Sequence, residues 1–312
     1  MTEEEAAAAE TPAAMQDASR DEGQQYALPL VIRVERAAPP ARTDALEGAA
    51  RAVLRFLSDP RVTEAAGEWA AAAQAWEDAR IRKVVRRARG AAWERASVLP
   101  GITVAHQSAE IRVYPPVPVD EWPADLARLQ VSGTDLDDPR APEAPAAETP
   151  VLWLNPGLPM TAGKAMAQAG HAAQLAWWQL SPRAKAEWLD RDFDLAVRVA
   201  GREQWAELLA SGLPVVTDGG FTEVAPGSAT VVADHPALRA VLLLSGLFLS
   251  SADFSADIRF LRYAARRMPP TPLRMWEGRR TWVLSGLGHR SSPDTSLRLR
   301  PSTTPARKPA SN

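Results

Sequence analysis

The sequence predicts an α/β fold in which a mixed β-sheet is flanked by helices in layers. Residues 151–238 give the order strand, helix, strand, helix, strand, strand, which is typical of layered α/β proteins. Hydrophobic residues make up 46% of the 312 residues, enough for a large core, and the length favours two domains. One interpretation is therefore two related α/β units in tandem, with disordered termini.

The first unit begins with a predicted strand and two helices. The β-branched residues of Tyr26–Val34 predict a strand. Ala45–Leu57 has helical spacing, and its helix ends at Asp59 because a proline follows. We expect a second helix over Glu64–Trp76.

The basic segment Ala79–Gly90 fits two structures. Ile81, Val85 and Ala88 lie on one face of a helix, whereas the consecutive residues Val84 and Val85 suit a strand. The elements expected next are short strands at Ile102–Ala105 and Glu110–Tyr114 and a helix at Trp122–Leu129.

The second unit has clearer signals. A long helix ends before Pro182, and a strand with alternating apolar residues follows it. Gly212 ends the next helix. The expected elements are strands at Val151–Leu154, Phe193–Val199, Leu213–Thr217 and Ala229–Ala233 and helices at Lys164–Leu180 and Glu203–Ser211.

Composition divides the chain into five parts. Residues 1–25 hold seven acids and one arginine and should be disordered. Residues 26–132 form the first unit, 133–150 are a Pro/Asp/Ala linker, and 151–238 form the second unit. Residues 239–312 hold thirteen Lys/Arg and four acids, and we expect a basic, mostly disordered tail.

A repeat connects the two units. Trp76 and Trp188 are 112 residues apart, as are Trp93 and Trp205, and the same offset places His106 opposite Asp218. An offset of 122 places Arg42 opposite Lys164 and Ala49 opposite His171. We expect residues 26–132 to be a degenerate copy packed as an intramolecular pseudo-dimer, with a homodimer and chance similarity as alternatives. The repeat requires a strand at Ile81–Arg87.

Several classes of protein are excluded or disfavoured. The chain has no cysteine, so disulfides and thiolate metal sites are excluded, and we expect a cytoplasmic protein. The longest apolar run, near Ala240–Leu249, has about half of the roughly 20 residues that span a bilayer. The net charge of −2 indicates neither DNA nor a membrane surface as a partner. We expect no metal or other cofactor.

Two polar clusters stand out. Lys164, Gln168 and His171 share one helix face, either as a solvated surface or as part of a site. Asp218 follows a buried strand, in the stretch TDGGFTEVAPGSATV, where α/β folds place functional groups. A turn-capping aspartate is the alternative there.

Together the clusters resemble the Pth2 (archaeal/eukaryotic-type) peptidyl-tRNA hydrolase family, over about residues 151–238. The first block matches at Leu158, Met160, Gly163, Lys164, Ala167, Gln168, His171 and Ala172. The second block matches at Asp218, Gly219, Gly220, Thr222, Ala225, Pro226, Gly227, Ser228 and Thr230. The sequence departs from the family at Asn155 and Gly157, where Arg and Asp are usual, and at Phe221.

The resemblance implies hydrolysis of the ester between a peptide and the terminal ribose of tRNA. The catalytic candidates it implies are Lys164, Gln168, His171, Asp218, Thr222 and Thr230. Gly163, Gly227 and Ser228 are candidates for substrate binding, together with Arg80, Lys83 and Arg87 of the basic segment. Residues 151–238 carry a net charge of −3, so tRNA phosphates must be bound by that segment or by the tail.

Two other functions remain open from the sequence. One is a decayed, non-catalytic module of this family that binds RNA or protein, which the loss of charge at Asn155 and Gly157 favours. The other is a different hydrolase or transferase that uses Asp218 and His171, although the sequence has no nucleophile elbow or metal-ligand spacing.

Overall fold

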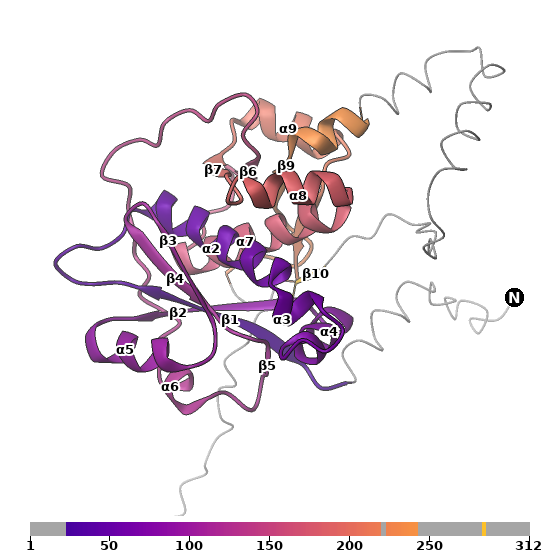
Figure 1. Ribbon diagram of the computed structural model, residues 1–312. Coiled ribbons are helices and arrows are strands. Elements are labelled where there is room, and N and C mark those ends of the chain that lie inside the picture. The colour runs from indigo at the N-terminus through magenta and orange to yellow at the C-terminus, as the bar shows by residue number, and fades with distance from the viewer. Residues whose placement is uncertain (1–22, 220–222, 243–282, 285–312) are drawn as a thin grey trace, which may run out of the picture.

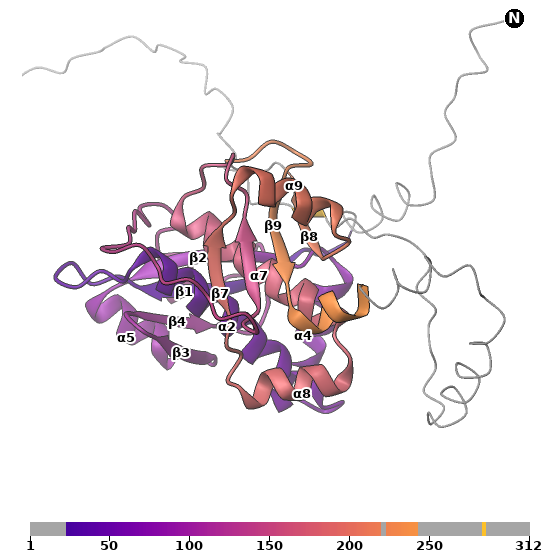
Figure 2. The same cartoon turned by 90° about the horizontal axis from the view of Figure 1, so that it is seen from above.

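The computed structural model describes residues 23–219, 223–242 and 283–284 and contains two mixed β-sheets with helices between and around them (Figure 1). The predicted α/β class is therefore confirmed. Viewed from above, the purple first sheet and the pink-to-orange second sheet occupy separate sides of the molecule (Figure 2). The predictions for residues 1–22 and for most of the tail lie outside the described residues.

The first sheet has the strand order β2-β1-β4-β3, with β5 paired to the end of β1. β1 and β2 are parallel, and β4 runs antiparallel to both β1 and β3. The strands are β1 (Tyr26–Arg33), β2 (Arg82–Ala88), β3 (Ile102–His106), β4 (Ala109–Val113) and β5 (Val117–Pro118).

The second sheet repeats this order as β7-β6-β9-β8, with β10 added beside β8. β6 and β7 are parallel, and β9 runs antiparallel to β6 and β8. The strands are β6 (Val151–Leu154), β7 (Ala196–Val199), β8 (Val215–Asp218), β9 (Ala229–Asp234) and β10 (Val283–Leu284). The second sheet is thus built from a β-α-α-β-α-β-β segment, and the first has the same connections with the short helix α3 (Pro60–Thr63) added before β2.

The helices include the predicted ones, one of them with a wrong start, and also three that were not predicted, at Pro60–Thr63, Gly90–Val98 and Pro182–Asp190. They are α2 (Arg42–Ser58), α3 (Pro60–Thr63), α4 (Ala70–Asp78), α5 (Gly90–Val98), α6 (Ala124–Ala127), α7 (Ala162–Gln179), α8 (Pro182–Asp190) and α9 (Arg202–Ala210). A helix starting at Glu64 is wrong, because Glu64 ends α3 and α4 starts only at Ala70. Helix α8 was not predicted, although Ser181 caps its N-terminus and Pro182 occupies its first turn.

The basic segment forms a strand, as the repeat requires. Lys83 to Ala88 pair in register with Leu28 to Arg33 of β1, so helical spacing at this point was misleading. The two tryptophans that indicated the repeat also make equivalent bonds. Trp76 Nε1 donates to the carbonyl of Arg82 and Trp188 Nε1 to that of Asp194, each at 2.8 Å.

Helices α2 and α7 pack against each other in the space between the sheets (Figure 1). Each helix covers its own sheet and also contacts the parallel edge strand of the other, α2 against β7 and α7 against β2. Close approach depends on small residues. A Cβ on Gly170 of α7 would lie 2.9 Å from Cγ2 of Val53 on α2 and 3.2 Å from Cδ of Lys83 on β2.

One apolar core runs through both halves as a result. It includes Leu30, Ile32 and Phe56 from the first half and Met166 and Trp188 from the second, all fully buried. A smaller core lies on the outer face of the first sheet, where α5 and α6 pack over Val31 through Trp93 and Leu126. The two halves therefore share their main source of stability.

The predicted linker and tail both contain fixed elements. Asp138 accepts hydrogen bonds from N and Oγ1 of Thr43 at the start of α2, at 2.8 and 2.7 Å. Thr134 Oγ1 accepts from the backbone N–H of Gly163 at the start of α7, at 2.9 Å. In the tail, β10 pairs with β8, and a helix spans the described residues 236–242, so the expectation of disorder is wrong at these positions.

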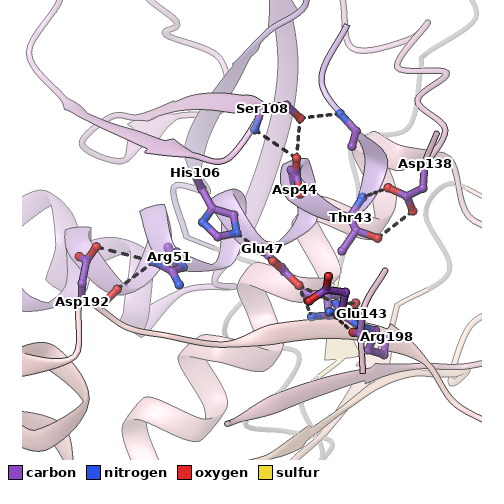
Figure 3. A network of polar contacts seen from close by, with 12 residues as sticks. Thr43, Asp44, Glu47, Arg51, His106, Ser108, Asp138, Glu143, Asp192 and Arg198 are labelled. Carbon is purple, nitrogen blue, oxygen red and sulfur yellow. Dashed lines mark hydrogen bonds and ion pairs between the residues drawn. The ribbon is translucent and has the colours of Figure 1, made fainter. Parts of the chain in front are cut away.

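A polar network on α2 joins the halves (Figure 3). Glu47 accepts hydrogen bonds from His106 Nε2 at 2.8 Å, from Arg198 at 2.7 Å and from the N–H of Val197 at 3.1 Å. Arg198 also donates to the carbonyl of Glu143. Burial raises the pKa of Glu47, but these hydrogen bonds outweigh it, so the pKa lies below its usual value.

Replacing Gly170 with leucine should lower the free energy of unfolding by about 1–3 kcal/mol, because the added side chain overlaps Val53 and Lys83. This loss is expected even though leucine favours a helix more than glycine does. Urea unfolding measures it. Combining the change with Val53→Ala should cost less than the two single changes together. If the double variant instead loses the sum of the two single losses in unfolding free energy, contact with Val53 is not what excludes a side chain at position 170.

Glu47→Gln should lower the free energy of unfolding at pH 7 by about 1–3 kcal/mol, because Arg198 and His106 lose their buried anion. A carboxyl whose pKa is lowered on folding stabilises the protein above its unfolded pKa of about 4.3. That contribution disappears as the pH falls through the folded pKa. The gap between wild type and variant in urea titrations should therefore narrow from pH 6 to pH 3, and a constant gap would contradict the assignment.

Candidate functional site

The candidate site lies where α7 passes the ends of β8 and β9. Asp218 Oδ2 accepts hydrogen bonds from Lys164 Nζ at 2.5 Å and from Gln168 Nε2 at 2.7 Å. Thr230 Oγ1 lies 2.7 Å from Gln168 Oε1. Four of the predicted residues, from two separate blocks of sequence, therefore form one connected network.

Local sequence explains how these side chains are held. Thr161 caps α7 by accepting from the N–H of Lys164 at 3.3 Å, so the lysine stands in the first turn. Gln168 follows four residues later on the same face. Asp218 N donates to Ser228 O at 2.9 Å, and Gly227 N donates to Asp218 O at 2.8 Å.

Gly227 has a φ of 79°, a backbone conformation in which glycine is favoured because other side chains are strained there. The hydrogen bonds of Gly227 and Ser228 to Asp218 use backbone atoms. Both residues therefore hold the backbone of Asp218, and they fix the turn after β8. Thr222, another candidate, lies outside the described residues.

The ion pair is shielded from water. Asp218 is 0% exposed, and the Lys164 side chain is 11% exposed. Gln168 and Thr230 are buried as well. The lysine is thus the more accessible partner of the pair.

His171 lies outside this hydrogen-bond network. It is buried, and its Nδ1 is 3.1 Å from Lys83 Nζ of the first sheet. Burial lowers the pKa of His171 well below its usual value, and the charges of Lys83 and Lys164 lower it further. The structure thus places a neutral imidazole between the site and the first half of the chain.

The basic segment does not form a phosphate-binding surface in this structure. Arg80 and Lys83 are buried. Arg87 donates to the carbonyl of Ser132 at 2.9 Å and also contacts the side chain of Gln130. Lys83 is thus held against α7, and Arg87 is held by residues just before the linker.

A cavity of about 630 Å³ adjoins the start of α7 and was not predicted from the sequence. Its wall includes Asn155 and Gly157, two of the three departures from the family pattern, and Glu223 from the loop after β8. Arg42 of α2 also lines it and donates to Met160 O at 3.1 Å. The repeat offset of 122, which aligns Arg42 with Lys164, indicated from the sequence that Arg42 lies at the start of its helix.

Gly163 faces the linker at the edge of this cavity. A Cβ on it would lie 2.9 Å from Thr134 Oγ1. The linker threonine therefore occupies the space that a ligand would need to reach the N–H of Gly163. Nothing in the isolated sequence of residues 133–150 indicated this contact.

Two absences apply to the described ranges alone. Within residues 23–219, 223–242 and 283–284, His, Asp and Glu do not gather in groups of three that would bind a metal ion. Among the helices of the same ranges, none combines the length and apolar character needed to cross a membrane.

Comparison with known proteins gives one family. Residues 149–243 match the family model described as peptidyl-tRNA hydrolase PTH2. The match covers the second sheet through β9, both polar blocks and the helix that follows β9. A search of curated proteins gives no match.

Proposed function

Residues 149–243 belong to the Pth2-type peptidyl-tRNA hydrolase family, and from this we propose that the protein hydrolyses the ester between a peptide and the terminal ribose of tRNA. The observation that carries the proposal is the hydrogen-bond network of Lys164, Gln168, Asp218 and Thr230. These residues belong to the family motifs, and they are connected around the carboxylate of Asp218. Such a reaction serves translation, so we place the protein in the cytoplasm.

Asp218 would orient and deprotonate the attacking water. A general base must be ionised and held still, and the hydrogen bonds from Lys164 and Gln168 favour both conditions. Thr230 fixes the rotation of the Gln168 amide through its Oε1. Base catalysis of this kind contributes about 10²–10⁴ in rate.

Lys164 would stabilise the oxyanion that forms when water attacks the ester carbonyl. Its ammonium is already placed by Asp218 in a site with little water, where a charge has a stronger effect than in solution. As the proton moves to Asp218, the attraction between that carboxyl and Lys164 weakens. The lysine then becomes available to the negative charge on the substrate.

The first half would be a degenerate copy that no longer carries the reaction. His106 ends β3 where Asp218 ends β8, and Glu47 of α2 holds it as Gln168 of α7 holds Asp218. Glu47 is also bonded to Arg198 of the other half. We propose that this position now serves the packing of an intramolecular pseudo-dimer.

The tail would supply the attraction for tRNA that the second half lacks. Residues 239–312 carry a net charge of +9, against −3 for residues 151–238. β10 pairs with β8 so that Leu284 is opposite Asp218, which attaches the tail beside the site. A basic segment near the site raises the local concentration of a polyanion and makes its binding dependent on salt.

An alternative function is a non-catalytic module that binds RNA or protein. The complete burial of Asp218 and the absence of the family's charged residues at Asn155 and Gly157 favour it. The same experiment separates it from the hydrolase.

Asp218→Asn and Lys164→Met should each lower kcat for release of peptide from purified peptidyl-tRNA by about 100-fold or more. The amide cannot accept a proton, and methionine keeps the shape of lysine without its charge. Asp190→Asn, on an exposed residue at the end of α8, is the control and should keep wild-type activity. Full activity in both site variants refutes the assignment. Tight tRNA binding by a wild type that releases no peptide establishes the binding module.

Replacing Arg290, Arg298 and Arg300 with glutamine should raise KM for peptidyl-tRNA and leave kcat unchanged. For each tRNA phosphate that the variant no longer neutralises, the slope of log K against log salt should fall by about 0.7–0.9. The slope is obtained from tRNA binding between 50 and 200 mM salt. An unchanged slope would show that these arginines of the tail do not contact tRNA.

A further inference from the structure

Lys83 is a lysine in the core between the two halves. It stands on β2 with its side chain directed at α7 and is only 8% exposed. Its Nζ lies 2.5 Å from Gln174 Oε1, 3.1 Å from His171 Nδ1 and 3.4 Å from Ile81 O. The amino group of Lys83 thus has three polar neighbours, two of them on the helix that carries Lys164 and Gln168.

The surroundings hold this side chain in place. Its ammonium lies 4.8 Å from the ring centroid of Trp76, and its Cδ packs against Gly170 of α7, where a side chain would not fit. Burial lowers the pKa of Lys83 well below its usual value, and the charge of Glu77 on α4 opposes this shift. The contacts fix the distance and rotation of α7 relative to β2.

Packing alone does not require a lysine here. In the second half, Leu195 occupies the position of Lys83, and it is buried in the same way. The corresponding turns of α2 carry Ala49, Ala50, Ala52 and Val53 instead of His171 and Gln174. Burying a charged group costs free energy that leucine does not. The polar set is therefore found only on the side that supports the candidate site.

We propose that Lys83 is a positioning residue for the hydrolase site, contributed by the first half of the chain. Its contacts to His171 and Gln174 hold α7 so that Lys164 and Gln168 meet Asp218. The effect of Lys83 on the reaction rests on the proposed function. Its contact with the imidazole of His171 rests on the geometry alone.

The proposal specifies the state of His171. Nδ1 of His171 pairs with Lys83 Nζ at 3.1 Å, and the ring is neutral because burial lowers its pKa well below its usual value. The charged groups that act on this ring are Lys83 from β2 and Lys164 from α7, and both favour the neutral form. His171 lies one helical turn from Gln168, so a change in the ring is transmitted to the site through one turn of helix.

The experiment compares wild type with Lys83→Met in the full chain. The ¹⁵N spectrum of the imidazoles contains four histidines, and a His171→Gln variant assigns the relevant one. Wild type should show a neutral imidazole at His171. Lys83→Met should change these shifts and lower kcat by about 10- to 100-fold through displacement of catalytic groups, with KM within about twofold.

Lys185→Met is the matched control. It removes a lysine on α8 that, like Lys83, acts electrostatically on Glu77, and the structure shows its ammonium over Trp177 and away from the His171 hydrogen bond. It should leave both the His171 shifts and kcat unchanged. Methionine at 83 should permit folding, because leucine fills the matching position of the other half.

Three results would overturn the proposal. They are His171 shifts that are the same in wild type and Lys83→Met, a Lys83→Met variant with altered shifts but normal kcat, and equal losses in the Lys185→Met control. If wild type does not cleave peptidyl-tRNA, the proposed function fails. The imidazole spectra of wild type and Lys83→Met then still decide whether Lys83 holds His171 as described.

Discussion

The close packing of α2 against α7, between two sheets, is the constraint on which the rest of the structure depends. Each helix must cover its own sheet and the edge strand of the other. Both helices therefore need small residues, and at Gly170 the space is filled by Val53 and Lys83 from the opposite half. The arrangement puts the main core and the candidate site on the same helix pair, so stability and site geometry are linked.

The two halves use one topology for different purposes. At the ends of β3 and β8, a helix side chain holds the last residue of the strand, as Glu47 holds His106 and Gln168 holds Asp218. The first pair continues into Arg198 and joins the halves, whereas the second continues into Lys164 and Thr230. The same topology therefore supports packing between the halves at one position and a polar network at the other.

The sequence predicted elements better than contacts. Strand alternation and proline positions located most elements, and a repeat of tryptophans resolved β2, where helical spacing and β-branched residues disagreed. Motif spacing identified Lys164, Gln168, Asp218 and Thr230. It could not identify Lys83 as a core residue, because a lysine in a basic run looks like surface until the opposite half supplies its acceptors. Nor could motif spacing show that Thr134, in an apparent linker, accepts a hydrogen bond from the start of α7.

The polarity of the site is set by the carboxylate of Asp218. An ionised carboxylate accepts hydrogen bonds and cannot donate them, so Gln168 must present its NH₂ group. The amide oxygen then faces Thr230, whose hydroxyl must donate. Replacing the buried ion pair with apolar residues is often neutral for stability or stabilising. The cost of burying Lys164 and Asp218 is therefore better explained by chemistry, in which a fixed anion and cation act on a substrate without reorganising.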